Sequence, residues 1–181
     1  MNTVKPHSKF LLVLLSALVA FGPLSIDMYL PSLPSIALDL SSNVAAVQKT
    51  ITIFLIGFSV GMLIYGPLSD RYGRKKLLMM GMALYVLATL GCIFASQIEH
   101  LQGYRLLQAL GGASASVLSR ALVRDLFNNA EIPKILSLMH IITMIATLIA
   151  PIAGALIVEY FHWTGIFVFL LIYSFLCLLW A

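Results

Sequence analysis

The feature that most constrains this chain is a series of long apolar runs, and the first, from Phe10 to Ile26, contains no charged residue. A helix needs roughly 18 or more such residues to cross a hydrocarbon core of about 30 Å. The composition agrees, because 61% of the 181 residues are hydrophobic and 10% are charged, whereas soluble domains average about 25% charged residues. The sequence therefore predicts an all-α integral membrane protein.

Hydropathy divides the chain into six apolar segments joined by short connections. The predicted transmembrane helices are 10–30, 44–68, 77–97, 102–123, 134–158 and 163–181. We therefore expect residues 1–181 to form one bundle of six transmembrane helices. The first segment is long for a signal peptide and lacks a clear small-x-small cleavage site, so we expect it to be retained. Cys92 and Cys177 lie in apolar runs without metal-ligand spacing and are interpreted as packing residues.

Basic residues predict the orientation of this bundle. Nine of them fall at one set of helix ends, namely Lys5, Lys9, Arg71, Arg74, Lys75, Lys76, Arg120, Arg124 and Lys134. The opposite side holds Lys49. Positive charge is retained in the cytoplasm, so the N-terminus is predicted to be cytoplasmic, and the net charge of +4 requires no nucleic-acid partner. The aromatic residues predicted near the outer membrane surface are Tyr29, Tyr104, Tyr160 and Trp163.

Two charged residues lie within the apolar segments. Asp27 falls toward the outer end of the first predicted helix, and Arg105 lies near the start of the fourth, which runs the opposite way. Helical spacing places each of these charges on a face of small or polar residues, and the second helix has a similar face. On the fourth helix the face consists of Arg105, Gln108, Gly112, Ser116 and Ser119. On the first helix it consists of Ser16, Ala20, Pro23 and Asp27, and on the second of Gln48, Thr52 and Ser59. Two readings remain open. Either the two charges reach the membrane surface, or Asp27 is a protonatable carboxylate beside a watery cavity, influenced by Arg105.

The stretch GPLSDRYGRKK, Gly66 to Lys76, connects the second and third predicted helices. It contains one acid among four bases, and Gly66 and Gly73 allow close packing or unusual dihedral angles. Asp70 is able to cap a helix end or to pair with Arg71 or Arg74. By charge alone, this stretch is interpreted as a tight, solvated cytoplasmic turn.

Four stretches together resemble one transporter family. GPLSDRYGRKK is similar to the loop signature of the major facilitator superfamily. SIDMYLPSLP resembles the first-helix signature of its twelve-helix drug:proton antiporters, especially the bicyclomycin-resistance (Bcr/CflA) branch. GYRLLQALGGASAS resembles their fourth-helix motif, with the motif arginine at Arg105. LIAPIAGAL resembles the fifth-helix antiporter motif, with Pro151 and Gly154 at matching positions, although Ala150 and Ala155 stand where the family usually has glycine.

The resemblance implies a fold of two six-helix halves, each built from two inverted three-helix repeats. It covers the whole chain but half of that fold. The sequence ends at Ala181 within an apolar run, so we expect residues 1–181 to be the N-terminal half, with the C-terminal half absent.

The resemblance also implies a function: proton-coupled efflux of small, largely apolar compounds across the inner membrane, and with it antibiotic resistance. Asp27 is the implied proton carrier, and Arg105 is expected to bias its protonation. Substrate-cavity residues are expected at Tyr29, Gln108, Gly112 and Ser116. The implied cytoplasmic latch comprises Gly66, Asp70, Arg71, Gly73, Arg74 and Lys75, with Arg74 pairing to Asp125. Pro151 and Gly154 are expected to shape the fifth helix where the halves meet.

The expected partners are protons, a small-molecule substrate, the lipid bilayer and the missing C-terminal half, with no nucleic acid, cofactor or metal. Two other functions remain open: a metabolite or sugar carrier on the same fold, and a non-transporting six-helix membrane protein. An intramembrane enzyme is disfavoured, because His140 has no His, Cys or Asp partner at useful spacing.

Overall fold

A computed structural model describes residues 6–180, with side chains from Phe10 onward. The described chain is almost entirely helical and contains no strand, which confirms the predicted all-α class. Its elements are α1 (Pro6–Val19), α2 (Phe21–Asp27), η1 (Leu30–Ser32), α3 (Leu33–Asp39), α4 (Val44–Tyr72), α5 (Arg74–Ile93), α6 (Ile98–Leu126), α7 (Ile132–Phe161) and α8 (Thr164–Trp180).

The lengths of these helices fit a multi-pass membrane protein. Helices α4, α5, α6 and α7 are each long and apolar enough to cross a bilayer. The bent pair Phe10–Val19 and Phe21–Asp39 passes the same test together, and α8 is a shorter apolar helix of 17 residues. These six units correspond to the six predicted segments, apart from residue 181, which lies outside the described residues.

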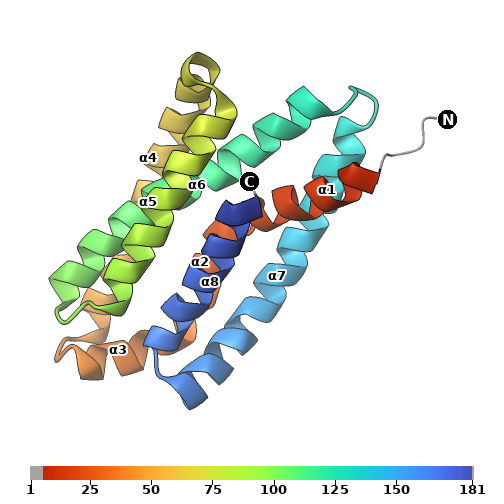
Figure 1. Ribbon diagram of the computed structural model, residues 1–181. Helices are drawn as coiled ribbons and strands as arrows, with labels where there is room; N and C mark the ends of the chain where they lie inside the picture. The colour runs from red at the N-terminus through yellow and green to blue at the C-terminus, as the bar shows by residue number, and fades with distance from the viewer. Residues whose placement is uncertain (1–5, 181) are drawn as a thin grey trace.

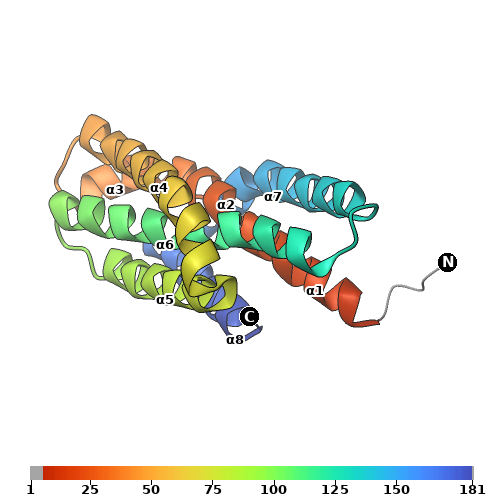
Figure 2. The ribbon, with the colours of Figure 1, turned by 90° about the horizontal axis from the view of Figure 1, so that it is seen from above.

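The helices form one elongated bundle with its connections at two ends (Figure 1). Helix α6 packs against both α4 and α5 and lies between them (Figure 2). Helices α1 and α2 pack against α6 and α7, and α8 contacts α5 and α7. The α4–α5 turn and the α6–α7 connection share the upper end in Figure 1, where most of the basic residues predicted to be cytoplasmic lie. Lys5 and the side chain of Lys9 lie outside the described residues.

The first predicted helix, 10–30, is not continuous, which corrects that prediction. It breaks at Ala20, and its two parts are bent by 46°. Pro23 supplies the cause, because proline has no N–H for the carbonyl of Val19 and its ring crowds that carbonyl. At the break, the Ala20 amide is shared between the carbonyls of Ser16 and Ala17, at 3.3 and 3.1 Å.

Residues 31–39 were predicted as a connection but fold as η1 and α3. Pro31 and Pro34 occupy the first turns of these two helices, where a missing N–H costs nothing. Leu33, Ile36 and Ala37 of α3 are buried in the core. The connection between the first span and α4 is therefore a packed cap on the bundle.

The stretch Gly66–Lys76 was predicted as a turn but is almost entirely helical. Helix α4 continues through Pro67 to Tyr72, and α5 starts at Arg74, so Gly73 alone separates them. Gly73 has φ 90° and ψ 136°, which favours glycine because it has no Cβ. Gly66, by contrast, is helical and faces open space.

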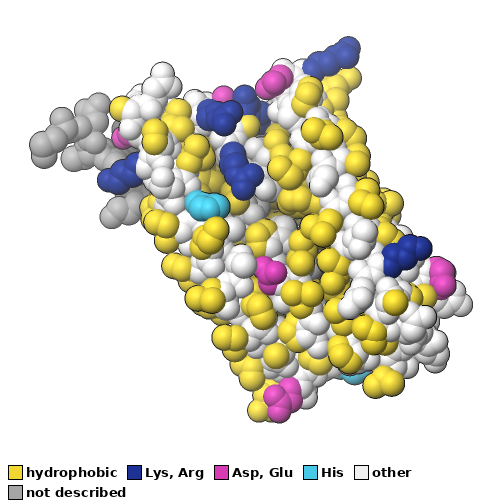
Figure 3. Space-filling model, turned by 180° about the vertical axis from the view of Figure 1, so that it is seen from behind, with side chains coloured by type: hydrophobic (Ala, Val, Ile, Leu, Met, Phe, Trp, Pro, Cys, Tyr) yellow, Lys and Arg dark blue, Asp and Glu magenta, His cyan; other side chains and the backbone are white. Residues whose placement is uncertain are grey.

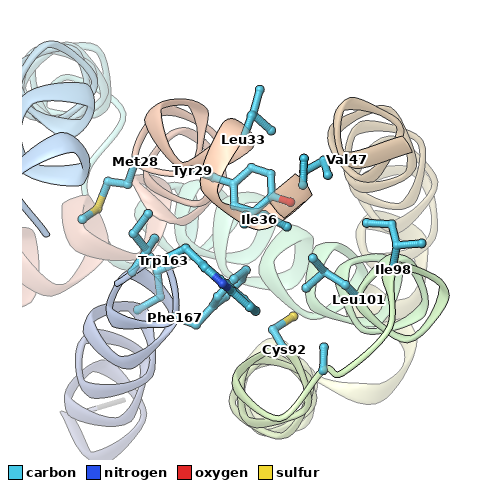
Figure 4. Packing of buried hydrophobic residues seen from close by; sticks show 14 of the residues in the cluster. Met28, Tyr29, Leu33, Ile36, Val47, Cys92, Ile98, Leu101, Trp163 and Phe167 are labelled. Atoms are coloured by element: carbon cyan, nitrogen blue, oxygen red, sulfur yellow. The ribbon is translucent and has the colours of Figure 1, made fainter. Parts of the chain in front are cut away.

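Apolar side chains form two clusters within the bundle. One cluster centres on the end of α2 and contains Tyr29, which Figure 4 shows close to Leu33, Ile36 and Val47. The other lies toward the α4–α5 turn and contains Phe21 and Tyr85. Tyr29 and Trp163, predicted at the membrane surface, are 0% and 3% exposed. Both rings complete the first cluster inside the bundle. Their depth near the outer membrane surface stays a prediction.

Candidate functional site

Asp27 is the last residue of α2, where the regular α-helix ends before η1. Its side chain is partly buried. Within residues 10–180 it forms no ion pair and no hydrogen bond through its carboxylate. The predicted coupling of Asp27 to Arg105 is therefore not a direct salt bridge.

Arg105 of α6 is completely buried. Its guanidinium carbon lies 4.6 Å from the ring centre of Tyr29, 4.3 Å from that of Phe54 and 5.9 Å from that of Phe167. Cation–π contacts that are shielded from water contribute about 2 kcal/mol or more. Three rings from three different parts of the chain thus enclose a charge that has no carboxylate partner among the described residues.

The guanidinium of Arg105 also donates a hydrogen bond to the backbone of the first span. In a continuous helix, the carbonyl of Ser25 would accept a bond from the Tyr29 amide, but that amide bonds Ile26 at 3.1 Å. Arg105 Nη2 donates to the freed Ser25 carbonyl at 3.0 Å. Charged donors stabilise helix carboxyl ends, where carbonyl groups lack partners. Arg105 therefore bonds the backbone two residues before Asp27.

Polar side chains extend this arrangement into a chain of hydrogen bonds. Arg105 Nη1 donates to Gln108 Oε1 at 2.8 Å, and Gln108 Nε2 donates to Thr89 at 2.9 Å. Two hydroxyl pairs lie nearby, Ser25 with Tyr85 at 2.7 Å and Tyr29 with Thr50 at 2.9 Å. All of these groups are buried. The predicted stripe on α6 therefore borders a buried polar layer at this depth.

The four predicted cavity residues separate into two groups. Tyr29 and Gln108 belong to the buried network, and Gly112 is packed against the rings of Tyr85 and Phe58. Ser116 lines an open groove further along α6. Ser116 is thus the member of the set that the structure places where a ligand can enter.

This groove runs along one face of the bundle, between α4 and α7 (Figure 3). It consists of three hollows of about 360, 350 and 320 Å³, and Arg120 lines each of them. The walls of the third hollow come from the first span, α4, α6 and α7: Val19, Pro23, Phe58, Met62, Ser116, Arg120, His140, Thr143, Met144 and Thr147. Lys and Arg side chains gather toward the upper end of this face in Figure 3.

The predicted cytoplasmic motif forms a connected group of charges. Arg74 Nε lies 2.6 Å from Asp125 Oδ2, which confirms the predicted pairing between the start of α5 and the end of α6. Arg74 also contacts Asp70 on the preceding turn at 3.4 Å. Arg71 lies over the ring of Tyr72 at 5.4 Å. Gly73 turns the chain so that Arg74 reaches both acids. Lys75 follows on α5 and forms no ion pair among the described residues.

The predicted antiporter motif lies on α7, which is continuous through Pro151. Gly154 is buried, and a Cβ atom placed there would lie 2.9 Å from both the Cα and the carbonyl carbon of Met28. Gly154 therefore lets α7 approach the backbone of the first span directly beside Asp27. Within this bundle, Gly154 thus packs α7 against the first span.

Several residues that build the site were not singled out from the sequence. Ser25, Thr50, Tyr85 and Thr89 look unremarkable as isolated hydroxyl groups, although each is a polar group within an apolar helix. Arg120 was read only as a positive charge near a helix end. No group of three or more His, Cys, Asp or Glu residues able to hold a metal ion occurs in the described part of the chain.

Comparison with known proteins places the chain in a family of transporters. The sequence model of the Major Facilitator Superfamily matches residues 13–181. The MFS-type transporter YdgK of Bacillus subtilis is 43% identical over 92% of this chain and 42% of its own length. The bicyclomycin resistance protein homolog of Haemophilus influenzae is 40% identical over 92% of this chain and 42% of its own length. Multidrug resistance protein D of Escherichia coli is 33% identical over 90% of this chain and 41% of its own length. The chain thus spans about two fifths of the length of these relatives.

Proposed function

Because this chain belongs to the Major Facilitator Superfamily, we propose that it forms the N-terminal half of a drug:proton antiporter in the inner membrane, with a cytoplasmic N-terminus. The proposed cargo is a small, largely apolar compound that leaves the cell as protons enter. Two relatives carry the names of bicyclomycin and multidrug resistance proteins, which supports efflux over the uptake of a metabolite or sugar.

The observation that carries this proposal is the position of Asp27. A carboxylate with no ion-pair partner among the described residues lies at a helix break, in a span whose neighbouring residues line the groove. A charged group within the membrane costs about 2.5–3.5 kcal/mol, so its neutral form is favoured whenever the site is closed off from water. A carboxylate so placed exchanges a proton each time the site opens.

Arg105 has a positioning role in this proposal. By bonding the Ser25 carbonyl, it holds the end of α2 at a constant position against α6. Its charge lies inside the aromatic enclosure, which keeps it in place while Asp27 gains and loses a proton.

The Arg74 contacts support a second element of the mechanism. Alternating access requires one bundle to move as a unit against another. Arg74 ties the end of α4 and the start of α5 to the end of α6, so these helices move together. The exposed Asp70 carboxylate, which is 70% accessible, remains available to a second half.

The test uses a twelve-helix carrier that contains this half, in everted membrane vesicles with an imposed pH gradient. Asp27→Asn keeps the size of the side chain and removes its titration, so bicyclomycin-driven proton release should disappear while carrier abundance stays normal. Glu159→Gln, at an exposed position near the end of α7, is the matched control and should retain activity. Undiminished exchange in Asp27→Asn would remove Asp27 as the proton site.

A further inference from the structure

Arg120 is a cation in the groove that the mechanism above does not use. Its side chain is exposed and lines all three hollows. Within residues 10–180, no carboxylate lies within 4 Å of it, whereas Arg74 is paired with two. Arg120, on α6, therefore brings a positive charge into the groove without an ion-pair partner among the described residues.

The surroundings of Arg120 select for an anion. The two hollows between α6 and α7 are lined by no Asp or Glu among the described residues. They contain hydrogen-bonding groups instead, from Ser116 on α6 and from Ser137, His140 and Thr143 on α7. Asp70 lines the remaining hollow, toward the α4–α5 turn, beyond ion-pair distance from Arg120. A cation in a concave surface without nearby acids attracts negative ligands.

The rest of the wall is apolar. Pro23, Phe58, Met62 and Met144 line the same hollow as Arg120. Its volume of about 320 Å³ is at the lower end of the range for small-molecule sites, about 300–1,000 Å³. Flexible methionine side chains adapt to ligands of different shape. One end of the hollow thus suits a charged group and the remainder suits a hydrocarbon or aromatic body.

We propose that this groove binds amphipathic organic anions. Their carboxylate is held by the guanidinium of Arg120, and their apolar body lies against Phe58, Met62 and Met144. A guanidinium presents two parallel N–H groups that match a carboxylate, which makes the contact directional as well as attractive. This inference rests on the proposed transport function and names a substrate class for it.

The test measures binding to the 181-residue chain in phosphatidylcholine nanodiscs, by calorimetry. The probes are 2-naphthoate and 2-naphthamide, which share a ring system and differ in charge. Naphthoate should bind about tenfold to a hundredfold more tightly, the difference expected of a charge-assisted hydrogen bond. Arg120→Gln should abolish this preference, and Arg120→Lys should retain most of it. Lys134→Gln, at an exposed position at the start of α7 that lines none of the three hollows, removes an equal charge and should leave the preference unchanged.

Equal binding of the two probes to the wild-type chain would overturn the proposal. An equal loss of the preference in Arg120→Gln and Lys134→Gln would also overturn it. Repeating the titration in discs containing phosphatidylglycerol separates the two sources of anion. A retained preference supports a small-molecule site, whereas its loss would assign Arg120 to a lipid headgroup. No pH gradient or second half is required, so failure here is distinct from failure of the Asp27→Asn test.

Discussion

Gly154→Ala is the substitution whose effect follows most directly from the packing. The new Cβ would lie 2.9 Å from the Cα and the carbonyl carbon of Met28, whereas carbon atoms pack best at about 3.5–4.0 Å. The atoms that the new Cβ would meet belong to the backbone of Met28, so no change of side-chain rotamer can relieve the contact. Helix α7 or the first span must therefore move by roughly 1 Å to restore contact distances.

The expected cost is that of an overpacked core, about 1–3 kcal/mol. Gly103→Ala is the matched control, because Gly103 is also helical and a Cβ atom placed there would have no neighbouring atom within 4 Å. Alanine stabilises a helix by about 0.8–1.0 kcal/mol relative to glycine. The two glycine-to-alanine changes should therefore have opposite signs and differ by about 2–4 kcal/mol.

The assay is unfolding of the purified chain in mixed detergent micelles as the fraction of sodium dodecyl sulfate rises, followed by circular dichroism. Gly154→Ala should unfold at a lower fraction than the wild type, and Gly103→Ala at the same or a higher one. Equal stability of the two variants would refute the close approach of α7 to Met28. It would also remove the argument that the antiporter motif positions the backbone beside Asp27.

Three other perturbations test the buried charge, the orientation and the need for a second half. Arg105→Lys should lower the free energy of unfolding by about 2–4 kcal/mol, because lysine cannot serve Gln108 and Ser25 together or stack on the rings; unchanged unfolding in the same micelles would contradict the role of the guanidinium. Lys75→Cys should react with an impermeant maleimide in everted vesicles but not in intact cells, as the charge distribution predicts. Residues 1–181 in liposomes should show no saturable drug movement under a pH gradient, because one bundle supplies one wall of a midplane site; gradient-driven movement that is lost in Asp27→Asn would prove this wrong.

The sequence by itself determined which segments are able to cross the membrane and which family they resemble. Hydropathy is a local property, so the six apolar segments correspond to helical units in the structure. The ends of five of them shift by a few residues, whereas the first is broken at Ala20 and continues to Asp39. A turn in the Gly66–Lys76 stretch was also expected from its glycines, and Gly73 has the positive φ that favours glycine. The Arg74–Asp125 pair was implied by the family resemblance. Pro23 indicates a break near Ala20 in the sequence itself, but hydropathy alone does not detect it.

The surroundings of the two membrane-embedded charges were decided only by the tertiary structure. Arg105 is enclosed by Tyr29, Phe54 and Phe167, which come from three separate parts of the chain and meet only when the bundle closes. Spacing along α6 showed that Arg105 and Ser116 share a face, but not that neighbouring helices cover one end of that face and leave the other open. Burial depends on which side chains the neighbouring helices place at a position. For that reason the buried Arg105 layer and the open Arg120 groove could not be told apart from the sequence.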